Sequence, residues 1–104
     1  MAKVTKLIVV YTTWDPISKY VRRVCKEVAK EEGVELDERE EDWEFLAKYG
    51  EKDEIAGVDI PQVLVQYDDD RIVHVMTRIP ITDKGKPDLD KAKSIIKNAI
   101  KGGT

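Results

Sequence analysis

The sequence predicts an α/β fold with helices on both faces of a four-stranded mixed sheet, and three observations support this prediction. The apolar run Leu7–Tyr11 is typical of a central strand that is covered on both faces. An amphipathic helix over 16–33 and a short strand over 34–37 come next, which is the pattern of a β-α-β unit. Two further strands over 63–67 and 72–77 are separated only by a turn, so they predict an antiparallel hairpin.

The first helix has clear start and stop signals. Asp15 precedes Pro16, and this pair favours a helix start because the carboxylate accepts hydrogen bonds from free amides while proline fits the first turn. Apolar residues then recur at steps of three and four on one side, and charged residues occupy the other side. Gly33 is expected to end the helix. The strand after it should run parallel to the first strand through a right-handed crossover.

The rest of the chain predicts two more helices. Negative charge precedes a helix over 43–50, and Asp88 is expected to cap a last helix that ends at Gly102. The complete order is strand, helix, strand, helix, strand, strand, helix (βαβαββα). No repeat or linker divides residues 1–104, so we expect a single domain.

Composition argues against several classes of protein. The 18 basic and 21 acidic residues give a formal net charge of -3, which offers no long-range field for nucleic acid. No apolar run approaches the roughly 20 residues that span a bilayer, and no basic and then apolar signal segment opens the chain. We therefore expect no nucleic-acid partner, no membrane partner and a cytoplasmic location. Abundant Lys and Glu beside scarce Asn and Gln favour a thermophilic source.

The remaining chemistry-bearing residues are expected to be structural. Cys25, the only cysteine, cannot form an intrachain disulfide, and the helical pattern places it in the buried stripe. His74 is the only histidine and is expected on one strand face with Met76, where it makes a poor metal site, so we expect no metal and no cofactor. The acidic series over 37–42 is expected to be solvated surface at a junction between strand and helix, and Asp68–Asp70 to be a hairpin turn.

The order of elements, Trp14 at the first helix start and Ile60-Pro61 before the hairpin together resemble the thioredoxin-like fold, with the glutaredoxin-like subgroup fitting best. The resemblance covers roughly residues 6–101. In that family a nucleophilic cysteine lies just before the first helix, and a second cysteine three residues on resolves the mixed disulfide. In this chain the CPxC motif is replaced by Asp15, Pro16, Ile17 and Ser18 (DPIS). Neither a carboxylate nor a serine hydroxyl carries dithiol exchange, so we expect redox activity to be absent.

Other parts of the family pattern are kept or lost. Pro61 matches the family's cis-proline, and the resemblance implies that Ile60 presents backbone groups to an extended peptide or thiol ligand. Val9 stands where thioredoxins carry a buried acid. The segment 74–78 stands where glutaredoxins carry a Gly-Gly pair, so the resemblance gives no support for glutathione binding. The candidate binding site consists of Trp14, Asp15, Pro16, Ser18, Ile60 and Pro61.

Each of the local candidates also has a structural interpretation. Asp15 is expected to be a helix cap rather than a base, and Ser18 suits a side chain that satisfies first-turn amides. Trp14 is costly to expose in a polar loop, and both a ligand-facing and a packed side chain are compatible with its position.

The sequence therefore predicts a redox-inactive thioredoxin-like module without catalytic residues. It is expected to bind an extended protein segment, or to associate with itself as a homodimer, near the former active site. Two alternatives stay open. One is a thiol-disulfide oxidoreductase, a glutaredoxin-like electron carrier with an atypical or altered active site, and the other is a monothiol enzyme that uses Cys25.

Overall fold

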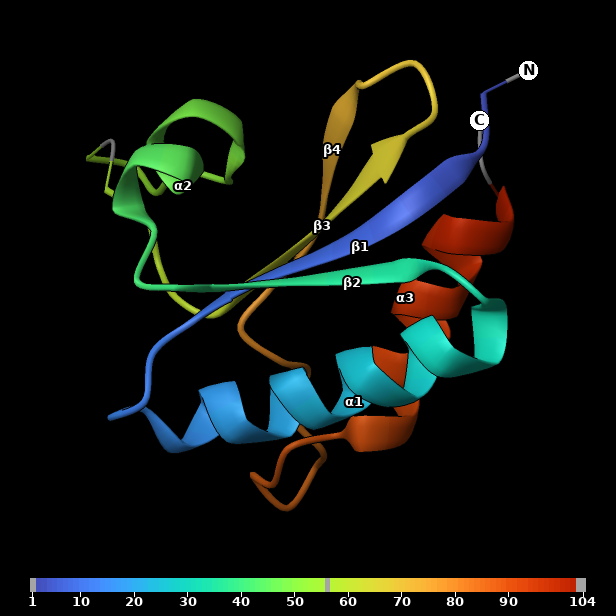
Figure 1. The fold of residues 1–104 in the computed structure, drawn as a ribbon. Coiled ribbons are helices and arrows are strands. Elements are labelled where there is room, and N and C mark those ends of the chain that lie inside the picture. The colour runs from blue at the N-terminus through green and yellow to red at the C-terminus, as the bar shows by residue number, and fades with distance from the viewer. Residues whose placement is uncertain (1, 56, 103–104) are drawn as a thin grey trace.

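A computed structural model describes residues 2–55 and 57–102 (Figure 1). These residues form a four-stranded mixed sheet and three helices. The elements are β1 (Val4–Tyr11), α1 (Pro16–Glu32), β2 (Glu35–Glu40), α2 (Trp43–Tyr49), β3 (Gln62–Tyr67), β4 (Ile72–Thr77) and α3 (Leu89–Gly102). The predicted α/β class with a four-stranded mixed sheet is confirmed.

The strand order in the sheet is β2-β1-β3-β4. β1 runs parallel to β2, with Tyr11 opposite Glu40, and antiparallel to β3, with Val10 opposite Gln62. β4 runs antiparallel to β3. The C-terminal ends of β1, β2 and β4 and the N-terminal end of β3 therefore lie along one edge of the sheet.

The helices cover both faces of the sheet, with α1 and α3 on one face and α2 on the other (Figure 1). Residues of β1 alternate between the two layers, because side chains along a strand point to opposite faces. Leu7 and Val9 belong to the buried cluster that includes α1 and α3, whereas Ile8 and Val10 belong to the cluster with α2. This double coverage explains why residues 7–11 of β1 form a continuous apolar run.

The signals at both ends of α1 have the predicted effect. Asp15 is the N-cap, and Gly33 at the C-cap has a left-handed φ of 69°, a conformation that glycine adopts without strain. Asp88 caps α3, because its Oδ1 accepts a hydrogen bond from the Lys91 backbone N–H at 3.0 Å.

The prediction for the second strand was too short. β2 spans Glu35–Glu40, so residues 37–40 of the acidic series belong to a strand rather than to a junction. β2 is an outer strand that pairs on one side only, and in such a strand charged side chains are tolerated and discourage pairing with other chains. Ion pairs within this surface help to hold it, including Arg22 to Glu38 at 3.1 Å and Arg39 to Asp37 at 3.0 Å.

A β-bulge changes the faces of β4. Val63 pairs with Met76 and Leu64 pairs with His74, so Val75 is an additional residue in β4. Met76 therefore packs in the cluster with α1 and α3, while His74 lies opposite Leu64 of the α2 cluster. The expectation that His74 and Met76 share a face was wrong, because period-two alternation does not survive a bulge.

No helix in the described part of the chain is long and apolar enough to cross a membrane.

Candidate functional site

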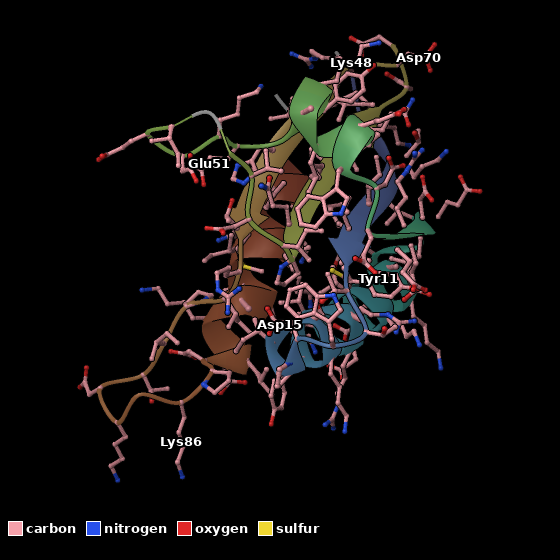
Figure 2. The ribbon with its side chains drawn as sticks, turned by 90° about the vertical axis from the view of Figure 1, so that its left-hand side faces the viewer. Tyr11, Asp15, Lys48, Glu51, Asp70 and Lys86 are labelled. Atoms are coloured by element: carbon pink, nitrogen blue, oxygen red, sulfur yellow. The ribbon has the colours of Figure 1, made fainter. Side chains whose placement is uncertain are left out.

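The edge of the sheet at the C-terminal end of β1 is where the chain changes faces. α1 covers one face on the way from β1 to β2, and α2 covers the other face on the way from β2 to β3. In open α/β sheets, ligands commonly bind outside the carboxyl ends of strands at such a point. We call the surface formed there the rim, and it consists of Thr12–Asp15, Glu41–Trp43, Asp59–Pro61 and Arg78. Figure 2 faces this edge, with Tyr11 and Asp15 marking the passage from β1 to α1.

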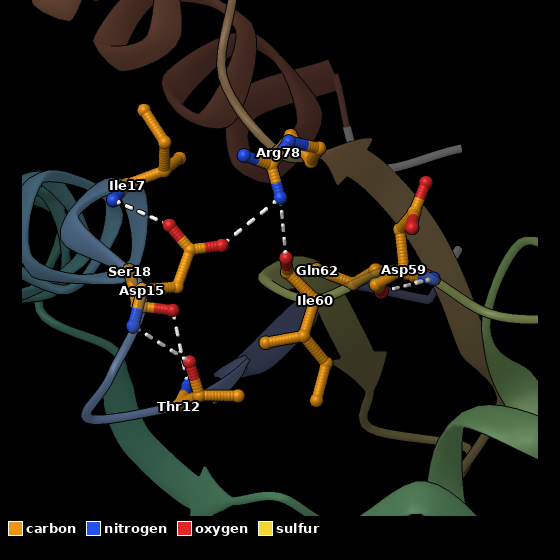
Figure 3. A network of polar contacts seen from close by, with 8 residues as sticks. All are labelled: Thr12, Asp15, Ile17, Ser18, Asp59, Ile60, Gln62 and Arg78. Atoms are coloured by element: carbon orange, nitrogen blue, oxygen red, sulfur yellow. Dashed lines mark hydrogen bonds and ion pairs between the residues drawn. The ribbon is translucent and has the colours of Figure 1, made fainter.

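The Asp15 carboxylate makes two different contacts at the rim (Figure 3). Its Oδ1 accepts a hydrogen bond from the Ile17 backbone N–H at 2.9 Å, which caps α1. Its Oδ2 accepts one from Nη1 of Arg78 at 3.0 Å, which forms an ion pair. Only 11% of the Asp15 side chain is exposed. Both carboxylate oxygens are therefore engaged within the protein.

Arg78 joins two segments of the rim. Its Nη1 donates to the Ile60 carbonyl oxygen at 2.9 Å as well as to Asp15, and its backbone N–H donates to the Pro61 carbonyl oxygen at 2.7 Å. The φ angle of Arg78 is 58°, a left-handed conformation that costs a non-glycine residue some strain. We call the contacts of Arg78 with Asp15 and Ile60 the Arg78 clasp.

The Ile60-Pro61 peptide bond is cis. The backbone of Ile60 was expected to be available to a ligand, but its carbonyl oxygen already accepts a hydrogen bond from Arg78. The Ile60 side chain is also buried, with 5% exposed. Pro61 is buried as well, so Ile60 and Pro61 form the floor of the rim rather than its outer surface.

Ser18 is fully buried beneath the loop between β1 and α1. Its Oγ accepts a hydrogen bond from the Thr12 backbone N–H at 3.0 Å, whereas the sequence suggested a bond to the first turn of the helix. Thr12 in turn accepts a hydrogen bond at Oγ1 from the Asp15 backbone N–H at 3.2 Å. Ser18 therefore fixes the loop that carries Trp14 and is not accessible as a nucleophile.

Gln62 fixes the opposite side of the rim. Its buried side chain donates from Nε2 to the carbonyl oxygens of Asp59 and Glu51, both at 3.0 Å, and accepts from the Glu51 backbone N–H at 2.8 Å. These bonds connect Asp59, before Pro61, to Glu51, which follows the C-terminal end of α2. The backbone of the rim is thus held on both sides by buried polar side chains.

Two tryptophans project from this rigid base. Trp14 is 69% exposed and Trp43 is 44% exposed. Each lies three residues after the end of its strand, β1 and β2, and these strands are parallel neighbours. Both side chains therefore belong to the same edge of the sheet.

The structure brings together all six residues that the sequence selected, but it divides them by accessibility. Trp14 and Pro16 are exposed, Asp15 is partly buried, and the rest are buried. Sequence reasoning missed Trp43 and Arg78. The matching position of Trp43 after a parallel strand was a usable signal, whereas Arg78 is 63 residues from Asp15 and no local pattern connects them.

A groove of about 530 Å³ continues from the rim along the outer side of α1. It is lined by Thr12, Thr13, Asp15, Lys19, Tyr20, Arg22, Arg23, Lys26 and Glu27.

The candidates outside the rim do not form a reactive site. Cys25 is fully buried, and burial, followed by the negative charge of Glu38, raises the pKa of its thiol. His74 lies 2.7 Å from the hydroxyl of Thr77, and partial burial lowers its pKa while the charge of Glu51 acts in the opposite direction. No cluster of three or more His, Cys, Asp or Glu side chains in the described residues is arranged to hold a metal ion.

Comparison with protein-family models, curated proteins and solved structures found no match to this chain. The resemblance to thioredoxin-like proteins therefore stays a prediction from the sequence, and the function of the rim has to follow from its own chemistry.

Proposed function

We propose that this protein is a redox-inactive, thioredoxin-like module of the glutaredoxin-like kind that binds an extended protein segment at the rim. The observation that carries the proposal is the exposure of Trp14, which is 69% accessible on a loop that hydrogen bonds from the backbone N–H groups of Thr12, Asp15 and Ile17 hold in place. A large aromatic side chain in such a position marks a binding surface, since tryptophan is among the residues that contribute most at protein interfaces.

The chemistry of the rim favours binding over thiol exchange. The positions of the family's two cysteines hold Asp15, which caps α1 and pairs with Arg78, and Ser18, which is buried. The one thiol, Cys25, is enclosed in the core with a raised pKa, so little of it is present as the reactive thiolate near neutral pH. Within residues 2–55 and 57–102, no specific contact favours either enzymatic alternative.

The shape of the rim favours an extended ligand. Trp14 and Trp43 follow neighbouring parallel strands, which lie about 4.8 Å apart in a sheet. Their exposed side chains thus form a surface that is elongated across the strand direction. The buried contacts of Ser18 and Gln62 and the Arg78 clasp hold this surface in place before binding, which lowers the entropic cost of association.

The experiment is capture of a partner by immobilised wild-type protein from lysate of the source organism, followed by mapping with the purified partner. Titration into 15N-labelled protein should shift the amide resonances of residues 13–15, 17–18, 41–43 and 78. Trp14→Ala should abolish capture, whereas Ile55→Ala, which shortens an 88% exposed side chain outside the rim, should leave it intact.

Two results would overturn the proposal. One is a captured partner whose binding leaves the rim resonances unmoved. The other is wild-type protein that sediments as a dimer while Trp14→Ala sediments as a monomer, because the rim would then be occupied by a second copy of this chain.

A further inference from the structure

Residues 12–15 join β1 to α1 and are called the Trp14 loop. The surfaces on its two sides carry opposite charge. On the side of β2 and α2, the exposed residues Glu40, Glu41 and Glu44 are acidic. On the other side, four cationic side chains and two acidic ones line the groove of about 530 Å³ along α1. Since the chain as a whole has a net charge of -3, this groove is a basic surface on an acidic protein.

The cationic side chains of the groove lie on one face of α1. Lys19, Arg22, Arg23 and Lys26 are three, four and seven residues apart, the spacing of neighbours on a helix surface. Lys19 and Lys26 are separated by about 10 Å along the helix axis, from the rise per residue. An extended chain covers that distance in about three residues.

These cationic side chains differ in whether they already form ion pairs within the protein. Arg22 pairs with Glu38 at 3.1 Å and lies over the ring of Tyr11, 3.9 Å from its centroid, so it is held in place. Arg23 has a longer contact of 3.7 Å with Glu27. No carboxylate among residues 2–55 and 57–102 forms an ion pair with Lys19 or Lys26, and both are exposed.

We infer that the segment bound at the rim is acidic and continues from Trp14 along this groove, with acidic side chains about three positions apart pairing with Lys19 and Lys26. This inference rests on the proposed function. Tyr20, which is 38% exposed and also lines the groove, offers the bound segment an aromatic contact beside the two lysines. At the other end of the segment, past Trp43 towards β2 and α2, acidic side chains meet the like charge of Glu40, Glu41 and Glu44, which costs affinity. The charge difference therefore fixes which end of the segment carries the acidic side chains.

The experiment selects ligands without assuming their sequence. A phage library of random short peptides is panned on wild-type protein and counter-selected on Trp14→Ala, so that the surviving peptides depend on the rim. The survivors should be enriched in Asp and Glu, with acidic pairs about three positions apart. Their affinity is then measured by fluorescence anisotropy at low and high salt.

The lysines are tested by charge reversal. Lys19→Glu combined with Lys26→Glu should weaken the selected peptides by about tenfold or more at low salt, and high salt should reduce the difference. The matched control is Lys84→Glu combined with Lys86→Glu, which reverses two exposed lysines of the loop before α3 and should leave affinity unchanged. All four lysines are exposed, so both variants should melt at temperatures close to that of the wild type.

The outcomes separate the two proposals. Peptides that depend on Trp14 but are neutral or basic, or that bind the charge-reversed variant as tightly as the wild type, overturn the acidic segment and leave the rim as the binding surface. If no peptide depends on Trp14, the proposed function fails, and the acidic segment fails with it.

Discussion

Cys25 is enclosed by α1 and the sheet, and none of its surface is exposed. Burial raises the pKa of the thiol because the charged thiolate loses its hydration, and the nearby negative charge of Glu38 adds to the effect. In the native protein a disulfide reagent such as DTNB should therefore react with Cys25 only on the timescale of unfolding. In denaturant the same thiol should react at once.

The matched control is Ser94→Cys in the Cys25→Ala background, which places a thiol on an exposed position of α3. This variant should react rapidly in its native state. A wild-type Cys25 that reacts as fast as the introduced cysteine would revive the monothiol alternative and contradict its structural role.

Asp15 combines a helix cap with an ion pair, and two substitutions separate these contributions. Asp15→Asn keeps a side-chain oxygen for the Ile17 amide, so it removes mainly the pair with Arg78, whose side chain is 45% exposed. We expect this change to lower the free energy of unfolding by about 1 to 2 kcal/mol, because Arg78 is exposed but the Asp15 side chain is largely buried. Asp15→Ala also removes the cap and should cost about 1 kcal/mol more.

Urea unfolding of both variants, in the wild-type and the Arg78→Ala backgrounds, measures these terms. In the Arg78→Ala background Asp15→Asn should have almost no effect, because its partner is absent. Equal losses for Asp15→Asn in the two backgrounds would show that the ion pair between Asp15 and Arg78 does not contribute to stability.

Single residues were predictable from the sequence where their role is local. The Asp15 cap needs only the following proline and the neighbouring Ile17 amide, and the burial of Cys25 follows from the helical period. The partner of Ser18 was not predictable, because its hydroxyl bonds to Thr12 in the preceding loop rather than to its own helix. Arg78 reaches Asp15 only after the sheet has assembled.

At the scale of elements, ion pairs join α1 to α3 across their exposed sides. Glu31 lies between Lys93 and Lys97, with N to O distances of 2.7 Å to both. Hydrogen bonds from Lys93 and then from Lys97 lower the pKa of Glu31 to about 2, from a usual value of 4.5. A carboxylate whose pKa is lower in the folded state stabilises the fold above its unfolded pKa. This contribution should be lost as the pH falls from 4.5 towards 2.

Thermal melting against pH tests this linkage. Glu31→Gln should melt below the wild type at neutral pH, and the difference should shrink as the pH falls through this range. High salt should also shrink it, because the side chain is exposed. Glu54→Gln, which changes another exposed glutamate, is the control and should show no such trend. A difference between the wild type and Glu31→Gln that stays constant down to pH 2 would contradict the lowered pKa.

Helices and strands were predicted well where the hydrophobic period and the end signals agree. They were predicted poorly where pairing with other strands determines the structure. α1 has both kinds of signal. β2 is almost entirely charged, and it forms a strand because β1 offers a pairing edge rather than because its own sequence favours one. The bulge at Val75 is likewise a property of the pairing between β3 and β4.

At the scale of the whole molecule, the rim collects segments from four separate parts of the chain along one edge of the sheet. The sequence predicted the strand order only as far as the β-α-β unit and the hairpin. It therefore indicated the Trp14 side of the rim but not the tryptophan after β2. The opposite charges on the two sides of the Trp14 loop are also visible only in the assembled fold.

The central claim is that Trp14 provides binding affinity at a rim that performs no thiol chemistry. The most direct measurement is the dissociation constant of the captured partner for wild-type protein and Trp14→Ala, by titration calorimetry under fully reducing conditions. We predict tight binding by the wild type in the presence of reductant and a loss of at least about tenfold for Trp14→Ala, as for a central interface tryptophan. An unchanged dissociation constant for Trp14→Ala, or binding that disappears when the protein is reduced, would contradict the account.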